Sequence, residues 1–189
     1  VPRFVVAPTT VSQCFWNAIE AFNLAEKYQT PVFLVSDLAM SVTEQTFEPE
    51  TFDMDEVEIE RGNVVDENDI DSWLDEQGRF QPHFATADGV SPRAFPGTED
   101  GAHMTTGLEH DALGRRTEDQ EVRVEQVDKR SRKVETAREE EDWSCREFGD
   151  PDADTLVISW GSNEGAIREG MDILAEDGID IRLLSVRSE

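Results

Sequence analysis

The sequence predicts an α/β protein built from parallel-sheet βαβ units, and three observations lead to this fold class. Short apolar runs at residues 3–7 and 32–35 flank a segment whose apolar residues recur at three-and-four spacing. The strand, helix, strand pattern returns near the other end, with apolar runs at residues 155–159 and 179–186. A helix that joins two strands in this way forms a right-handed crossover, and the strands are parallel. Each end of the chain therefore predicts one crossover unit.

The first unit begins with a strand over residues 3–7, and Thr9 and Thr10 then supply a turn and a helix N-cap. Pro31 stops the helix because proline has no main-chain donor. Residues 32–35 are four apolar residues in a row, which is typical of a strand covered on both faces.

Asp37 follows this second strand after a single serine. Ligands of open parallel sheets lie outside the carboxyl ends of the strands, so this acid can hold a ligand or an adjoining loop. The alternative, which we favour, is that Asp37 caps a turn over residues 38–41.

Residues 43–80 form an acidic insert. Val57 and Ile59 alternate with glutamates, which predicts a short edge strand, and residues 67–76 predict a short amphipathic helix. A strand over residues 80–86 is expected to follow. The acids indicate a solvated face, and the lack of an Asp-x-Asp-x-Asp-Gly loop disfavours calcium.

The loop over residues 87–116 is chemically the most varied stretch, as in a working loop or a linker. Arg93 can present a forked donor to a carboxylate or phosphate; the favoured alternative is that it pairs with a local acid and pins the loop. His103 titrates near neutrality when unperturbed, but no nucleophile accompanies it at fixed spacing. The scattered histidines disfavour zinc. We therefore predict no catalytic residue and no metal site, and keep Arg93, His103 and Asp37 as candidates for substrate or loop contacts.

Residues 117–142 predict the longest helix, polar nearly all round, with Val124, Val127 and Val134 as a thin apolar stripe. We expect it to connect two α/β units. In the last unit, residues 160–163 form a turn before a helix that Gly178 terminates. This helix N-terminus can receive an anion, but no nucleotide-binding signature is present, so a plain crossover is favoured.

Charge bounds the function. The chain has 43 Asp and Glu against 17 Lys and Arg, a net charge of −26, which argues against binding nucleic acid or an anionic membrane. Such a composition is typical either of disorder or of the acidic coat of a halophilic protein. Periodic segments at both ends and only three lysines (Lys27, Lys129 and Lys133) favour the second.

Cysteine content and hydropathy predict a cytoplasmic protein. No signal peptide or apolar span is present. Cys14 falls on an apolar helical face and Cys145 in an acidic loop, and two cysteines are too few to ligate an iron–sulfur cluster.

Three segments carry a family resemblance. The loop contains SPRAFPG and TTGLEHDALGRRTED before a helix with DKRSRKVE; residues 21–41 read AFNLAEKYQTPVFLVSDLAMS; residues 154–187 read DTLVISWGSNEGAIREGMDILAEDGIDIRLLSVR. In their order along the chain, these segments resemble the alpha subunit of the 2-oxoacid:ferredoxin oxidoreductases, in particular the 2-oxoglutarate type of halophilic archaea. The resemblance implies that residues 1–116 end a thiamine-pyrimidine-binding domain, residues 117–150 connect, and residues 151–189 start a transketolase-C-terminal-like domain.

The resemblance also implies an activity. Members oxidatively decarboxylate 2-oxoglutarate or a related 2-oxoacid to acyl-coenzyme A and reduce ferredoxin. They use thiamine diphosphate, magnesium and an iron–sulfur cluster, with a beta subunit as partner. The family's YPITP-type motif, its activating glutamate and its GPSTG-type loop precede this region, so no catalytic residue is carried over and this piece alone is expected to bind no cofactor.

The chain is expected to be an internal fragment, because it does not begin with Met and its last apolar strand has no following segment to cover it. The alternative function is a non-catalytic acidic α/β protein-interaction module.

Overall fold

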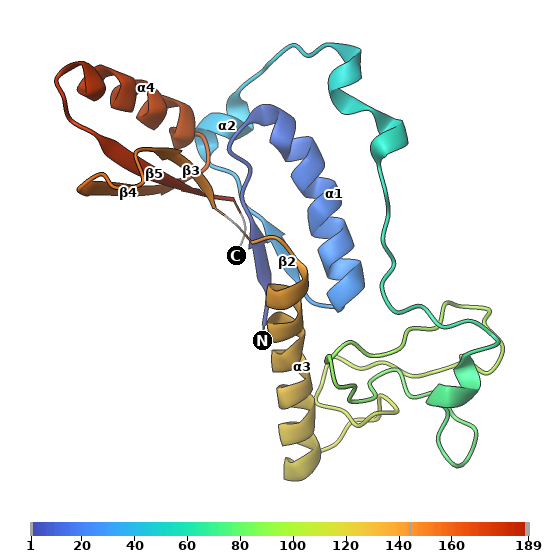
Figure 1. Ribbon diagram of the computed structural model, residues 1–189. Helices are drawn as coiled ribbons and strands as arrows, with labels where there is room; N and C mark the ends of the chain where they lie inside the picture. Colours follow the sequence, from blue (N-terminus) through green and yellow to red (C-terminus); the bar gives the residue numbers. More distant parts are fainter. Residues whose placement is uncertain (1, 144, 188–189) are drawn as a thin grey trace. The chain divides into compact units, whose positions relative to one another are not determined.

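The computed structural model describes residues 2–143 and 145–187, which divide into two compact units (Figure 1). We call the first the loop unit; it comprises residue 2 with Glu26–Thr30 and Glu60–Glu141. The second, the sheet unit, comprises Arg3–Ala25, Pro31–Ile59 and residues 142–187.

The sheet unit begins with the predicted crossover. Strand β1 (Phe4–Val6) and strand β2 (Val32–Leu34) are parallel and are joined by helix α1 (Val11–Tyr28), whose last turn belongs to the loop unit. The Thr10 hydroxyl accepts a hydrogen bond from Gln13 N at 3.3 Å, which confirms the predicted N-cap. The short helix α2 (Leu38–Val42) follows β2.

Strand β2 differs from expectation in its burial. A strand covered on both faces was predicted, but Phe33 is 48% exposed and Leu34 is 44% exposed. The prediction was wrong for this chain because β1 is the only paired neighbour of β2 among the described residues, and a two-stranded sheet leaves one edge and much of its surface open.

The second crossover is also present, with one addition. Strands β4 (Thr155–Trp160) and β5 (Ile181–Val186) are parallel and joined by helix α4 (Asn163–Glu176). Strand β3 (Arg146–Gly149), which was not predicted, pairs antiparallel with β5, so the order is β3-β5-β4. Gly178, at φ +75°, terminates α4 as predicted, and its N–H donates to Ala175 O at 3.0 Å.

This order corrects one sequence argument. The strand at residues 181–186 was expected to lack cover, whereas β5 is the central strand and Leu183 and Ser185 are fully buried.

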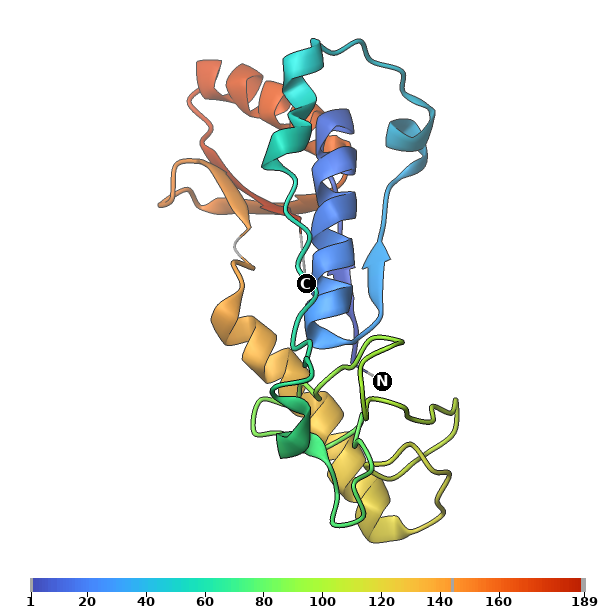
Figure 2. The same ribbon diagram turned by 90° about the vertical axis from the view of Figure 1, so that its right-hand side faces the viewer.

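The loop unit is built on one helix, α3 (Gln120–Glu140), against which residues 60–116 lie as irregular chain (Figures 1 and 2). Asp119 caps the helix by accepting from Glu121 N and Val122 N. The irregular chain has a small core of its own, formed by apolar side chains of Val65, Ile70, Phe80 and Ala94 with Trp73 and Leu74 packed against it.

Three local predictions for residues 43–86 were wrong. The edge strand around Val57 and Ile59 is replaced by two short 3-10 helices (Pro49–Phe52 and Met54–Glu56) and extended chain. The helix over residues 67–76 shrinks to a 3-10 turn (Ile70–Trp73), and the strand over residues 80–86 is a single bridge between Leu74 and Phe80. The sequence alternates or repeats over too few residues here for local periodicity to decide the backbone.

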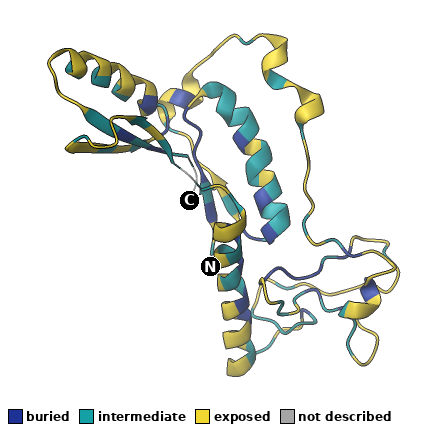
Figure 3. Cartoon of the chain, in the orientation of Figure 1, coloured by how far each residue is buried: buried dark blue, intermediate teal, exposed yellow. Residues whose placement is uncertain are grey.

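The buried face of α3 also differs from the predicted one. Val124 and Val127 of the expected apolar stripe are exposed, and the buried positions are instead the polar Gln126, Lys129 and Lys133, together with Ala137. These positions follow the three-and-four spacing of one helical face, and Figure 3 shows buried and exposed residues alternating along the helix. No helix of the described residues combines the length and apolarity that crossing a bilayer requires.

Candidate functional site

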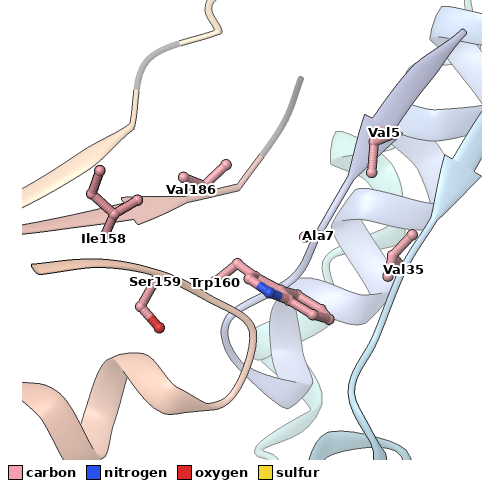
Figure 4. Close-up of a pocket in the computed structure, with 7 residues that line it drawn as sticks. All are labelled: Val5, Ala7, Val35, Ile158, Ser159, Trp160 and Val186. Atoms are coloured by element: carbon pink, nitrogen blue, oxygen red, sulfur yellow. The ribbon is translucent and has the colours of Figure 1, made fainter.

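A cavity of about 290 Å³ lies in the sheet unit where the parallel strands of both crossovers end (Figure 4). Trp160 projects from the end of β4 towards Ala7 and Val35, which follow β1 and β2. The carboxyl ends of parallel strands are where α/β sheets receive ligands. The lining is mostly apolar and consists of Val5, Ala7, Val35, Ile158, Ser159, Trp160 and Val186.

Asp37 lies beside this cavity and uses both carboxylate oxygens. Oδ1 accepts from Met40 N at 2.9 Å, so Asp37 caps α2 as the favoured interpretation predicted. Oδ2 accepts from Ser162 N at 2.6 Å, at the start of α4. The hydrogen bonds from the Met40 and Ser162 main chains hold the pKa of the Asp37 carboxyl below its usual value. The sequence also allowed Asp37 to hold an adjoining loop, and its hydrogen bond from Ser162 N shows this role in addition to the cap.

This arrangement also bears on whether an anion can bind at the N-terminus of α4, a possibility that the sequence disfavoured against a plain crossover. A helix N-terminus attracts an anion because its first N–H groups are unpaired and its dipole is positive there. In this protein the carboxylate of Asp37 lies in that position. An incoming phosphate at Ser162 N would meet a fixed negative charge.

The N-terminal turn of α4 is anchored to the sheet by a buried carboxylate. Glu164, which is buried, accepts from Ser185 Oγ of β5 at 2.7 Å and pairs with Arg146 of β3 at 3.0 Å. Removing either partner would leave a buried charge poorly compensated. The start of α4 is therefore held against the three-stranded sheet.

In the loop unit, Arg93 pairs with an acid, as favoured from the sequence, but its partner Glu26 is 67 positions away in the chain and is not a local acid. Its Nη2 donates to Glu26 Oε2 at 2.7 Å and to Arg61 O at 2.5 Å. The hydrogen bond from Arg93 lowers the pKa of the Glu26 carboxyl. Both of these hydrogen bonds use Nη2, and the buried Nε of Arg93 has no hydrogen-bond partner among the described residues.

His103 does not meet Arg93. Its Nδ1 lies 2.7 Å from Gly101 O, and its ring packs on Phe80 with centroids 5.5 Å apart. His103 lines an open surface hollow with Phe95, Pro96, Gly97 and Thr98. Arg93 and His103 belong to the loop unit and Asp37 to the sheet unit, so neither unit brings the three candidates into one site.

Sequence reasoning missed the buried lysines of α3. Lys129 is only 3% exposed and donates to His83 O at 3.0 Å and Ser91 Oγ at 2.9 Å, while Lys133 donates to Gln29 O at 3.1 Å. Burial lowers the pKa of Lys129 to about 7 and that of Lys133 to about 8. The available signal was polar residues at the helical spacing normally taken by apolar ones.

Two imidazole rings pack against each other next to these lysines. The rings of His83 and His110 have centroids 3.8 Å apart, and burial lowers the pKa of His83 to about 3. His83 is therefore neutral near pH 7. Within residues 2–143 and 145–187, no group of three or more His, Cys, Asp or Glu side chains is arranged to hold a metal ion.

Thiamine diphosphate, which the family resemblance implies, does not fit the cavity of the sheet unit. A diphosphate needs cationic or main-chain N–H donors, whereas the lining here is aliphatic and aromatic with one serine. The N–H of Ser162 is already bonded to Asp37.

Comparison with known proteins places the chain. The family described as "Pyruvate flavodoxin/ferredoxin oxidoreductase, thiamine diP-bdg" matches residues 1–129. Subunit alpha of 2-oxoacid:ferredoxin oxidoreductase 1 from Sulfurisphaera tokodaii is 37% identical over 188 residues, and the Saccharolobus solfataricus alpha subunit is 36% identical. Each alignment covers 98% of this chain and 28% of the relative, so the chain spans little more than a quarter of the length of these relatives.

A solved structure shows the same fold. The 2-oxoglutarate:ferredoxin oxidoreductase from Magnetococcus marinus, with 2-oxoglutarate, coenzyme A and succinyl-CoA bound, superimposes with a TM-score of 0.78 at 29% identity. The match covers 98% of this chain and 31% of that chain. These similarities confirm the resemblance noted in the sequence, and the chain belongs to the pyruvate flavodoxin/ferredoxin oxidoreductase family of thiamine diphosphate-binding proteins.

Proposed function

We propose that this chain is part of the alpha subunit of a 2-oxoacid:ferredoxin oxidoreductase. The complete enzyme would oxidatively decarboxylate 2-oxoglutarate or a related 2-oxoacid to the acyl-coenzyme A and pass the electrons to ferredoxin. The observation that carries this proposal is the structural similarity to the Magnetococcus marinus enzyme over 98% of the chain, which includes both units.

The domain assignment is part of the same proposal. Residues 1–116 would end a thiamine-pyrimidine-binding domain, residues 117–150 would connect, and residues 151–189 would start a transketolase-C-terminal-like domain. The family match over residues 1–129 supports the first assignment. The β4-α4-β5 crossover supports an α/β domain in the last segment.

The cofactors and partners follow from this assignment. Thiamine diphosphate and magnesium would be held by other parts of the complex, and a beta subunit would carry the iron–sulfur cluster that reduces ferredoxin. The two cysteines described here, Cys14 and Cys145, are free thiols, which suits a reducing cytoplasm.

We also propose that the protein is adapted to high salt. Its net charge is −26, and it has only three lysines. Lys129 and Lys133 are buried, and Lys27 pairs with Glu141 at 2.8 Å and Glu140 at 3.4 Å. Acidic groups therefore dominate the water-facing surface, as expected where concentrated counter-ions screen their repulsion.

The decisive experiment is an assay of the full-length complex. Coenzyme A-dependent reduction of a viologen dye would be measured in molar salt with 2-oxoglutarate, pyruvate and a branched 2-oxoacid in turn. Turnover with one or more of these is expected. A correctly assembled complex that turns over none of them would favour the non-catalytic interaction module instead.

A further inference from the structure

We propose that Asp37 is a positioning residue: its carboxylate fastens the chain after β2 to the start of α4 and so fixes the two walls of the cavity beside it. We call the hydrogen bond from Ser162 N to Asp37 Oδ2 the latch. Its effect on turnover rests on the proposed function, whereas its existence is tested independently of activity.

Capping α2 does not account for the carboxylate. An N-cap needs one acceptor oxygen, and serine or asparagine supplies it about as well as aspartate. Oδ1 of Asp37 meets this need through Met40 N at 2.9 Å. The second oxygen, 2.6 Å from Ser162 N, bridges 125 positions of sequence and requires a group with two acceptors.

Gly161 is shaped to receive this carboxylate. Its φ of +70° is a left-handed conformation that side chains disfavour, and a Cβ at this position would overlap Asp37 Oδ2. Any other residue at position 161 would have to displace the carboxylate. The close approach at Gly161 and the hydrogen bond from Ser162 N therefore place the same carboxylate oxygen against the start of α4.

The latch lies at the ends of the strands that line the cavity. Val35 precedes Asp37 by two positions and Trp160 precedes Ser162 by two, and both side chains form the cavity wall. Glu164 holds the start of α4 to β3 and β5, so the position of Ser162 is fixed from the sheet side. Through its hydrogen bond from Ser162 N, Asp37 fixes the chain after β2 relative to the start of α4.

A second link supports the same junction. Ala7 N, after β1, donates to Arg187 O, after β5, at 2.6 Å. This main-chain bond joins the first crossover to the last independently of Asp37. Loss of the latch is therefore expected to loosen the cavity without unfolding the sheet unit.

The test compares Asp37→Ser with Asp53→Ser in the full-length complex. Asp53 is a matched control because it caps a 3-10 helix through Asp55 N at 2.9 Å with no bridging contact recorded in the described residues. Serine keeps the capping function at both positions. Hydrogen exchange of the peptide spanning residues 160–164 is expected to accelerate about tenfold or more in Asp37→Ser and to stay unchanged in Asp53→Ser.

Two further variants distinguish loss of the hydrogen bond from loss of packing around Asp37. Gly161→Ala pushes the carboxylate away without altering Asp37, and it should accelerate the same exchange. Asp37→Ala leaves room for a small anion, and about 100 mM formate should restore protection at Ser162, which loss of packing alone would not allow. Unchanged exchange at residues 160–164 in both Asp37→Ser and Gly161→Ala would overturn the latch.

Activity separates the positioning role from the latch. With the oxoacid that the wild type uses, Asp37→Ser is expected to lower kcat/KM about tenfold or more, since small misplacements of a site cost this much, and formate should partly restore Asp37→Ala. Faster exchange with unchanged kcat and KM would overturn the positioning role. An inactive wild-type complex would instead refute the proposed function, and the exchange data would still decide whether the latch exists.

Discussion

Glu26 and Arg93 are 67 positions apart in the chain, yet Arg93 Nη2 donates to Glu26 Oε2 at 2.7 Å in the loop unit. The same carboxylate also pairs with Arg61 at 3.2 Å. Glu26 thus pairs with two arginines in a chain that has an excess of acids. This contact holds the start of the irregular chain, at Arg61, to the segment that carries Arg93.

Replacing Arg93 with Met should therefore lower the free energy of unfolding by about 1 kcal/mol at pH 7, the value typical of a partly exposed charged pair. The pKa of Glu26 is lowered from 4.5 by the hydrogen bond from Arg93. The contribution is present above pH 4.5 and is lost as the pH falls through the folded-state pKa. Urea midpoints of the full-length subunit, measured by pulse proteolysis, should differ between wild type and variant at pH 7 and converge in acid.

The control for this change is Arg79→Met. Arg79, whose side chain is 43% exposed, pairs with Asp75 only four positions earlier. A smaller loss than that of Arg93→Met is expected. Equal losses would show that the long-range pair does not organise the loop unit.

Lys129 and Lys133 should give the protein an unusual alkaline pH dependence. Burial lowers their pKa values from 10.5 to about 7 and about 8. Between these values and 10.5 the unfolded chain binds more protons than the folded one, so stability rises with pH, by up to about 1.4 kcal/mol per unit for each lysine. Relative to Lys129→Met, the wild type should gain stability from pH 7 to pH 9 in the same urea assay.

Lys27→Met serves as the comparison for the buried lysines. Although burial opposes it, the hydrogen bond and charge of Glu141 raise the pKa of Lys27 above 10.5. Its contribution is present below pH 10.5 and is lost only above that value. The difference between wild type and Lys27→Met should thus stay flat from pH 7 to pH 9, and a flat difference for Lys129→Met as well would contradict the assigned burial.

The contrast between the two units shows what sequence reasoning can reach. Both crossovers of the sheet unit were predicted, because α1 and α4 have regular apolar faces and β4 and β5 are apolar runs between turn residues. Strand β3 was missed because it is short and holds a single large apolar residue, Phe148, so it exists through pairing with β5. Tertiary pairing of this kind leaves little local trace.

The loop unit was beyond sequence reasoning for a different reason. Its irregular backbone is ordered by side chains of α3 that donate to main-chain oxygens far away in sequence: Gln126 and Lys129 to His83 O, Arg132 to Thr86 O, and Thr136 to Asp88 O. These side-chain bonds take the place of the main-chain hydrogen bonds of helices and sheets, whose presence the spacing of apolar residues can predict. Of the candidate residues, Asp37 could be placed because it follows a strand, whereas the partners of Arg93 and His103 could not.

Gly89 should be intolerant of any side chain. It adopts φ +81° against α3, and a Cβ there would overlap the main-chain oxygen of Lys129. Gly78 has a similar φ of +72° with open space around it, so Gly78→Ala isolates the conformational cost of about 1 kcal/mol. Gly89→Ala should cost about 1–3 kcal/mol more because backbone must move. Similar melting temperatures for the two variants of the full-length subunit would show that the irregular chain does not pack closely on α3.

Salt should stabilise the protein strongly. The net charge of −26 makes the compact state repel itself, and two of the three lysines are buried. At 1 M salt the screening length falls to about 3 Å, which suppresses repulsion between neighbouring carboxylates. The melting temperature of the full-length subunit should therefore rise steeply from 0.1 M to 3 M KCl.

Choline chloride at equal ionic strength should reproduce the low-salt part of this rise if screening is the cause. A melting temperature that is indifferent to both salts would mean that the acidic surface is not an adaptation to salt.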